Sequence, residues 1–337
     1  MMSRVFINRC GPAARPLRSL PRYNAGVAAV FAFSLAAGTA SAQTFGFATL
    51  QPGSLNHTSA AAIAKVLKEK AGMNVLVQPT SGDTAILPMV NRGEAEFGNG
   101  NIFEMHNAYE GAMPGGKMTN LRIIGVMHTL RTGFWVRKDS GMTTVADLRG
   151  KRVGWGFSAM PTIGVLGHAM IAAGGLTEKD IKPVLVPNVI RGADDFVSGA
   201  ADTFQFAFGA PKVREVDASV GGTRFLETDE KLMPEARKFF KWAYLTSISP
   251  APIFIGVTKP MKTFSFDNMI YTNARVKDEV VYKVLETMEK FKPDLVTIQP
   301  VLREFSAAAG YKTYDVPYHA GALKYFKERN LQPAALQ

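Results

Sequence analysis

The sequence KRVGWGFSAMPTIGVLGHAMIAA, residues 151–173, has the pattern of a strand, a short loop and a helix. The run 151–155 predicts the strand and the apolar run 162–173 predicts the helix. Further strands are predicted at 183–186 and 203–208, and further helices at 193–198 and 211–219. Strands that alternate with helices indicate βαβ units around a mostly parallel sheet, and therefore an α/β fold.

A similar cycle precedes this one. Strands are predicted at 44–50, 73–78, 121–127 and 134–137, with helices around Ile63 and Leu87 and a turn at 99–101. Past residue 250 the pattern predicts extended segments at 253–257 and 268–272 and an amphipathic helix at 276–291. Each cycle of about one hundred residues suffices for a core of its own. We therefore expect two lobes, 43–138 plus 250–337 and 139–249, with the chain crossing between them near 131–140 and 245–257.

The composition excludes several classes of protein. The chain has 337 residues, 47% of them hydrophobic and 20% charged, which is typical of a folded globular protein. It has no apolar run long enough for several membrane spans. Its single cysteine, Cys10, excludes a disulfide framework.

The first 42 residues have the three parts of a secretory signal peptide. Five arginines precede an apolar run at 25–37, and Ala40-Ser41-Ala42 provides the small residues of a cleavage site. A membrane anchor would need about 20 apolar residues, and a transit peptide would be amphipathic. We expect cleavage after Ala42 and a periplasmic protein. Its net charge would fall from +11 to +6, because five arginines and no acid leave, and no dense basic run suggests nucleic-acid binding.

Motifs for catalysis or cofactors are weak. Gly154, Gly156 and Ala159 fit a dinucleotide fingerprint, but bulky residues fill the variable positions and Asp180 falls in a predicted loop. The same segment lacks the second glycine of a nucleophile elbow. The five histidines form no close pair, so we expect no metal site, no cofactor and no catalytic residue.

Five loops that follow a strand and open a helix carry more information. They lie at 51–58, 79–84, 99–101, 157–162 and 208–212 and are rich in Gly, Ser, Thr or Asn. The N-terminus of a helix has unpaired N–H groups and a partial positive charge, so it favours an anion. Because the carboxyl ends of strands meet in one crevice, we expect these loops to form a site for a carboxylate.

Motifs in the same order along the chain resemble the TAXI-type solute receptors of tripartite ATP-independent periplasmic (TRAP) transporters. They include DLRGKRV at 147–153, AAGGL at 172–176, GAP at 209–211 and PYHAGALKYF at 317–326. The resemblance implies a two-lobed periplasmic-binding-protein type II fold, with two Rossmann-like lobes and a cleft at a hinge. It also implies delivery of a small carboxylate solute to a fused TRAP-type membrane subunit.

The loop 154–162 departs from that family, because Trp155, Phe157 and Met160 replace its glycines. An apolar wall there would favour a carboxylate with an apolar or aromatic part. The predicted ligand-binding residues are Ser54, Asn56, His57, Thr58, Ser81, Thr84, Asn101, Arg131, Trp155, Phe157, Ser158, Thr162, Phe208, Gly209 and Pro211.

These patterns favour a monomeric extracytoplasmic solute-binding receptor that is not an enzyme and has no nucleic-acid partner. Two alternatives stay open. The first is an exported α/β enzyme that uses Ser158 or His57. The second is a ligand-binding subunit for a signalling partner.

Overall fold

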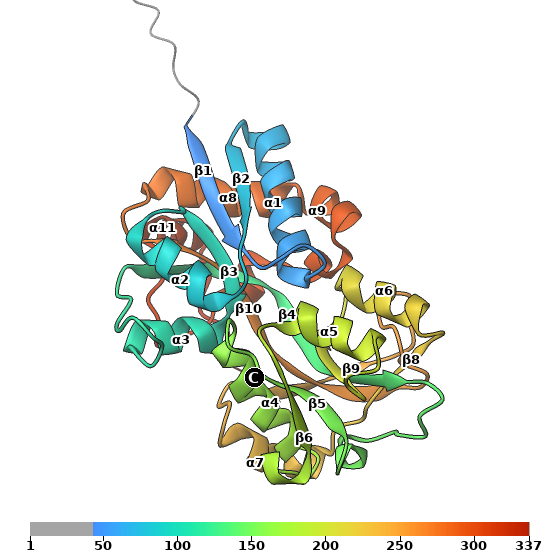
Figure 1. Ribbon diagram of the computed structural model, residues 1–337. Helices are drawn as coiled ribbons and strands as arrows, with labels where there is room; N and C mark the ends of the chain where they lie inside the picture. The colour runs from blue at the N-terminus through green and yellow to red at the C-terminus, as the bar shows by residue number, and fades with distance from the viewer. Residues whose placement is uncertain (1–42, 337) are drawn as a thin grey trace, which may run out of the picture. The chain divides into compact units, whose positions relative to one another are not determined.

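The computed structural model describes residues 43–336, so the predicted signal peptide at 1–42 lies outside the described residues. Among the helices it describes, none has both the length and the apolar character that a bilayer crossing requires. Figure 1 shows strands flanked by helices, as the alternating pattern predicts.

The first βαβ cycle follows the prediction closely. Its elements are β1 (Thr44–Thr49), α1 (Leu55–Ala71), β2 (Asn74–Pro79), α2 (Asp83–Arg92), β3 (Phe97–Asn101) and α3 (Ile102–Glu110). Strand β1 pairs in parallel with both β2 and β3. Ser54 and Asn101 cap α1 and α3, so each helix begins where a polar side chain accepts a backbone N–H.

The predicted turn at 99–101 is instead part of β3. Its glycines serve close packing: a Cβ at Gly98 would lie 2.5 Å from the Tyr271 ring, and one at Gly100 would meet the Glu104 carboxyl. Glycine therefore marks a close approach to the strand and not a change of direction.

Two long strands, β4 (Leu121–Arg137) and β10 (Met261–Asn273), organise the main sheet. The predicted strands at 121–127 and 134–137 form one strand, because the polar residues between them keep their ladder partners on β10. The pairs that β4 and β10 form with each other and with β3, β7, β8 and β9 are antiparallel, so the sheet is mixed where the sequence indicated a mostly parallel one. The strand order is β2-β1-β3-β10-β4-β7, where β7 is Phe204–Ala207. In addition, β8 (Thr223–Phe225) pairs with β4, and β9 (Tyr244–Ile248) pairs with β10.

The main sheet has two halves, and β4 and β10 belong to both. We call β1, β2, β3 and the adjoining ends of β10 and β4 the first sheet half. The second sheet half comprises β7 (Phe204–Ala207), β8 (Thr223–Phe225), β9 (Tyr244–Ile248) and the other ends of β4 and β10. Figure 1 shows β4 and β10 passing between the two groups of elements.

A small parallel sheet accompanies the second sheet half. It consists of β5 (Arg152–Gly156) and β6 (Lys182–Val186), and the Val153–Thr203 bridge connects it to the start of β7. Its helices are α4 (Pro161–Ala172), α5 (Val189–Val197), α6 (Pro211–Ser219) and α7 (Met233–Arg237). The segment predicted as extended at 253–257 forms turns instead, and its Ile255 carbonyl accepts a hydrogen bond from Trp135 Nε1.

The C-terminal part returns to the first sheet half. Its helices are α8 (Asp278–Lys290), α9 (Lys292–Ile298), α10 (Ala307–Gly310) and α11 (Ala320–Glu328). Short 3-10 helices occur at η1 (Val145–Leu148), η2 (Glu178–Asp180), η3 (Glu230–Leu232) and η4 (Pro300–Glu304). Val281, Val284 and Leu285 of α8 are buried in one core cluster with Ile63 and Val66 of α1. This apolar face is the one that the helical spacing predicts.

Candidate functional site

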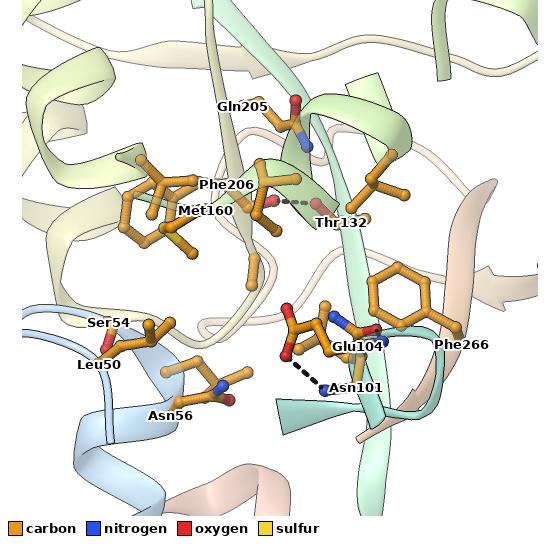
Figure 2. A pocket seen from close by; sticks show the side chains of 16 residues that line it. Leu50, Ser54, Asn56, Asn101, Glu104, Thr132, Met160, Gln205, Phe206 and Phe266 are labelled. Carbon is orange, nitrogen blue, oxygen red and sulfur yellow. Dashed lines mark hydrogen bonds between the residues drawn. The ribbon is translucent and has the colours of Figure 1, made fainter. Parts of the chain in front are cut away.

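A cavity of about 60 Å³ lies where the two sheet halves meet. Figure 2 shows the side chains of the 16 residues around it. Its lining residues are Leu50, Ser54, Leu55, Asn56, Asn101, Glu104, Leu130, Thr132, Met160, Ile163, Leu166, Val189, Gln205, Phe206, Ala207 and Phe266. Ligand clefts usually enclose about 300–1,000 Å³, so this space is smaller than a usual ligand cleft.

Helix caps hold several polar groups of the cavity. Ser54 Oγ accepts the His57 N–H at 3.1 Å and donates to the Gln51 carbonyl at 2.7 Å. Asn101 Oδ1 accepts the Glu104 N–H at 2.9 Å, and Glu104 Oε2 accepts the Asn101 N–H at 3.2 Å. This capping box fixes the Glu104 side chain beside the cavity.

A chain of buried amides positions Asn56. Its carbonyl accepts a hydrogen bond from Asn99 Nδ2 at 2.8 Å, and its Oδ1 accepts one from Asn268 Nδ2 at 2.9 Å. Asn268 Nδ2 also lies 3.2 Å from His128 Nε2. Burial lowers the pKa of His128, so the imidazole is neutral and Nε2 accepts this hydrogen bond while Nδ1 donates to the Thr129 carbonyl. The network links the cavity to both long strands.

The cavity is acidic. Glu104 is buried, and burial raises the pKa of its carboxyl well above the usual range, with the nearby Asp83 adding to the rise. Burial also raises the pKa of Asp83 to about 6, and the nearby Thr162 limits this rise. The Asp83 carboxyl oxygens approach Thr162 without full hydrogen-bond geometry. The lining residues include no Lys or Arg.

Gln205 enters the cavity from β7, on the opposite side from Glu104 (Figure 2). Its side chain is 4% exposed, and neither its Oε1 nor its Nε2 has a hydrogen-bond partner among the described residues. A buried amide without partners costs free energy, so its position is explained best by a group that enters the cavity.

Direct contacts join the two sides around the cavity. Thr84 at the start of α2 donates to the Ala159 carbonyl at 3.1 Å. A Cβ added to Gly82 would lie 1.9 Å from the same oxygen, so only glycine permits this approach. The Lys212 N–H donates to the Gly53 carbonyl at 3.1 Å. Each of these contacts joins a residue of the first α/β cycle to a residue of the second.

The structure brings three of the predicted ligand residues to the cavity: Ser54, Asn56 and Asn101. Thr58, Gly209 and Pro211 line a different groove of about 800 Å³ near Arg214 and Arg303. Trp155, Phe157 and Phe208 are buried in core clusters and do not line the cavity. His57, Ser81, Thr84, Ser158 and Thr162 also lie outside its lining, although Thr84 and Thr162 belong to the contacts around it.

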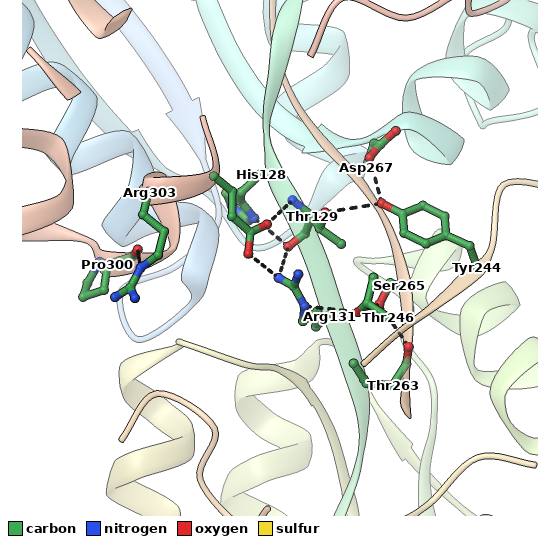
Figure 3. A network of polar contacts seen from close by, with 11 residues as sticks. His128, Thr129, Arg131, Tyr244, Thr246, Thr263, Ser265, Asp267, Pro300 and Arg303 are labelled. Atoms are coloured by element: carbon green, nitrogen blue, oxygen red, sulfur yellow. Dashed lines mark hydrogen bonds and ion pairs between the residues drawn. The ribbon is translucent and has the colours of Figure 1, made fainter. Parts of the chain in front are cut away.

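Arg131, the predicted charged ligand, has protein partners. Its Nη1 lies 2.7 Å from Glu304 Oε1, and its Nε donates to Thr246 Oγ1 at 3.1 Å. Glu304 also accepts the Thr129 N–H at 3.1 Å, so the network in Figure 3 ties η4 to β4 and β9. Arg131 is absent from the cavity lining, and its charge is balanced by Glu304.

Sequence reasoning missed the residues that enter the cavity from strands and from inside a helix. Glu104 had a signal, because Asn101 and Glu104 have the spacing of a capping box. Gln205 and Thr132 had none, since their place depends on the register of β7 against β4, where Thr132 pairs with Ala207.

Comparison with solved structures establishes the two-lobed α/β fold of periplasmic binding proteins. A structure described as a periplasmic transporter is 11% identical, covers 86% of this chain and 94% of its own, and has a TM-score of 0.58. A protein from Bordetella bronchiseptica RB50 is 13% identical, with coverage of 85% and 98% and a TM-score of 0.52. The alkanesulfonate-binding protein SsuA from Xanthomonas axonopodis pv. citri, bound to MOPS, is 15% identical, with coverage of 86% and 94% and a TM-score of 0.48. At the level of sequence families, residues 47–329 match the NMT1-like family, and the chain belongs to that family.

Proposed function

We propose that this protein is an extracytoplasmic receptor that captures a small organic solute and delivers it to a membrane transporter. The observation that carries the proposal is the cavity, which contains a buried Glu104 and a buried Gln205 whose amide has no hydrogen-bond partner within residues 43–336. The structural neighbour described as a periplasmic transporter supports the same function.

The finer assignments remain proposals. We propose export with cleavage after Ala42 and a TAXI-type partnership with a fused TRAP membrane subunit, on the motifs at 147–153 and 317–326. We also propose two lobes joined by β4 and β10. The pairing of Met261–Ser265 with β9 favours a second crossing within β10, farther along the chain than 245–257.

The proposed mechanism is closure around the solute. The contacts of Thr84 with Ala159 and of Lys212 with Gly53 join the two sides of the cavity, so they must separate for a solute to enter. A solute that touches both Glu104 and Gln205 gains contacts only in the closed form, and it therefore shifts the population toward that form. This lining does not favour the predicted carboxylate, because it includes a buried acid and no Lys or Arg to balance a second negative charge.

Native mass spectrometry tests the function. The exported protein, purified without added solute, should carry a bound small molecule that is lost on denaturation. The matched control is Ala207→Leu, which places an isobutyl group in the cavity. We expect the control to be folded and free of the small molecule. A wild-type protein that carries none, and that none of a broad set of organic solutes stabilises against thermal unfolding, would contradict the receptor function.

A further inference from the structure

We propose that the cavity binds a small organic ammonium compound, with its charged nitrogen at Glu104, an apolar body beside Met160 and Phe206, and a second polar group at Gln205. The proposal rests on the receptor function above and names the chemical class of the solute.

Glu104 offers one carboxylate oxygen to a ligand. Its Oε2 accepts the Asn101 N–H in the capping box, whereas Oε1 takes part in no hydrogen bond with the described residues. The residue is 6% exposed and lines the cavity. A buried carboxyl that has no cation beside it is stabilised by a ligand that donates a hydrogen bond or brings a positive charge.

Ser54 and Asn101, the two polar helix caps in the lining, already have partners. Ser54 accepts an N–H of the first turn of α1, and Asn101 accepts the Glu104 N–H in the first turn of α3. Asp83 lies close enough to raise the pKa of Glu104 further. The lining itself includes Glu104 and no Lys or Arg, so it offers no cation to balance the charge of a buried carboxylate ligand.

Gln205 specifies the other end of the ligand. Its amide presents both a donor and an acceptor, and both lack partners among the described residues. Figure 2 shows Gln205 across the cavity from Glu104, with Thr132, Met160 and Phe206 between them. The Thr132 hydroxyl already donates to the Phe206 carbonyl, so the middle of the cavity presents mainly apolar surface. A ligand with an ammonium group, a second polar group and an apolar body satisfies every part of this lining.

The proposal predicts a proton release. Because burial favours the neutral form of Glu104 in the empty cavity, a bound ammonium restores the charged carboxylate and a proton leaves for the solvent. A carboxylate ligand would keep Glu104 neutral and release no proton. The two ligand classes therefore differ in a quantity that calorimetry measures directly.

The test compares two probes that share an isobutyl body. L-leucinamide joins an ammonium group to an amide, and N-acetyl-L-leucine joins a carboxylate to an amide. Titration calorimetry of the full mature protein at pH 7, in two buffers with different ionisation enthalpies, gives the affinity and the proton count for each. We expect leucinamide to bind at least about tenfold more tightly and its binding to release protons.

Variants separate the two ends of the site. Glu104→Gln should lower leucinamide affinity by about tenfold or more and abolish the proton release. Glu110→Gln, which changes an exposed acid on the same helix, is the matched control and should change neither. Gln205→Met keeps the size of the side chain and should weaken the binding of both probes.

The outcomes distinguish this inference from the receptor function. Tighter binding of N-acetylleucine, binding of leucinamide without proton release, or failure of leucinamide to bind would overturn the inference. A co-purified solute found by native mass spectrometry to lack a basic nitrogen would also overturn it. In each case the receptor function would still hold if the wild-type protein carries a solute that the Ala207→Leu variant does not.

Discussion

Replacing Asp83 by Asn should stabilise the protein in neutral solution far more than in acid. Asp83 is 2% exposed at the start of α2, and burial raises the pKa of its carboxyl from 3.8 to about 6. A raised pKa means that the folded state favours the neutral acid. Its contribution to stability is complete below about pH 3.8 and is lost as the pH rises through about 6.

The magnitude follows from the shift. Each pKa unit corresponds to 1.36 kcal/mol, so a shift of about two units limits the effect to about 3 kcal/mol. Between pH 4 and pH 8 the free energy of unfolding should therefore fall by roughly 2 kcal/mol because of Asp83. Asn has the same shape and no charge, and it should remove this part of the pH dependence.

Urea unfolding at pH 4, 6 and 8 measures the effect as the difference between wild type and Asp83→Asn. We expect the variant to gain roughly 2 kcal/mol relative to wild type over this range. Asp139→Asn, which alters an exposed acid, is the control and should stay within about 0.5 kcal/mol at each pH. If Asp83→Asn loses stability relative to wild type as the pH rises, the assignment of a raised pKa is wrong.

Three further results are expected. Gly82→Ala should prevent full closure, since the added Cβ would lie 1.9 Å from the Ala159 carbonyl oxygen. Small-angle scattering should then show an increased radius of gyration. An unchanged radius would count against closure at this contact. Lys312→Met should lower the free energy of unfolding by about 3–5 kcal/mol, because Lys312 Nζ lies 2.7 Å from the buried Asp267 carboxylate and its removal leaves that charge without its partner. A loss below about 1 kcal/mol, measured by urea unfolding, would show that the pair contributes little. N-terminal sequencing of exported protein should begin at Gln43, and a retained Arg22 would refute the predicted cleavage site.

Local patterns predicted most of the elements. The helix predicted at 211–219 is α6 (Pro211–Ser219), because Pro211 suits the first turn of a helix. The strand order was beyond such reasoning. Strand β10 pairs with β4 across more than one hundred residues, as in Asn268 with His128, and no local pattern encodes that partner. The mixed sheet followed from this long-range pairing.

The candidate site was predictable only at helix starts. Ser54 and Asn101 were found because polar residues that follow a strand predict an N-cap. Phe157 was expected to line the cleft, yet it is 1% exposed and packs with Met160 and Val186. Which face of a loop an aromatic residue occupies depends on tertiary packing. Gln205 could not be predicted from the sequence, because an isolated polar residue in a strand has no distinctive local pattern.

X-ray diffraction of the exported protein, crystallised with the solute that it retains, tests the central claim most directly. The account predicts electron density for one small molecule between Glu104 and Gln205, in contact with both sheet halves. Density for the solute in the groove beside Arg214 and Arg303, with the cavity at Glu104 filled only by water or side chains, would contradict it.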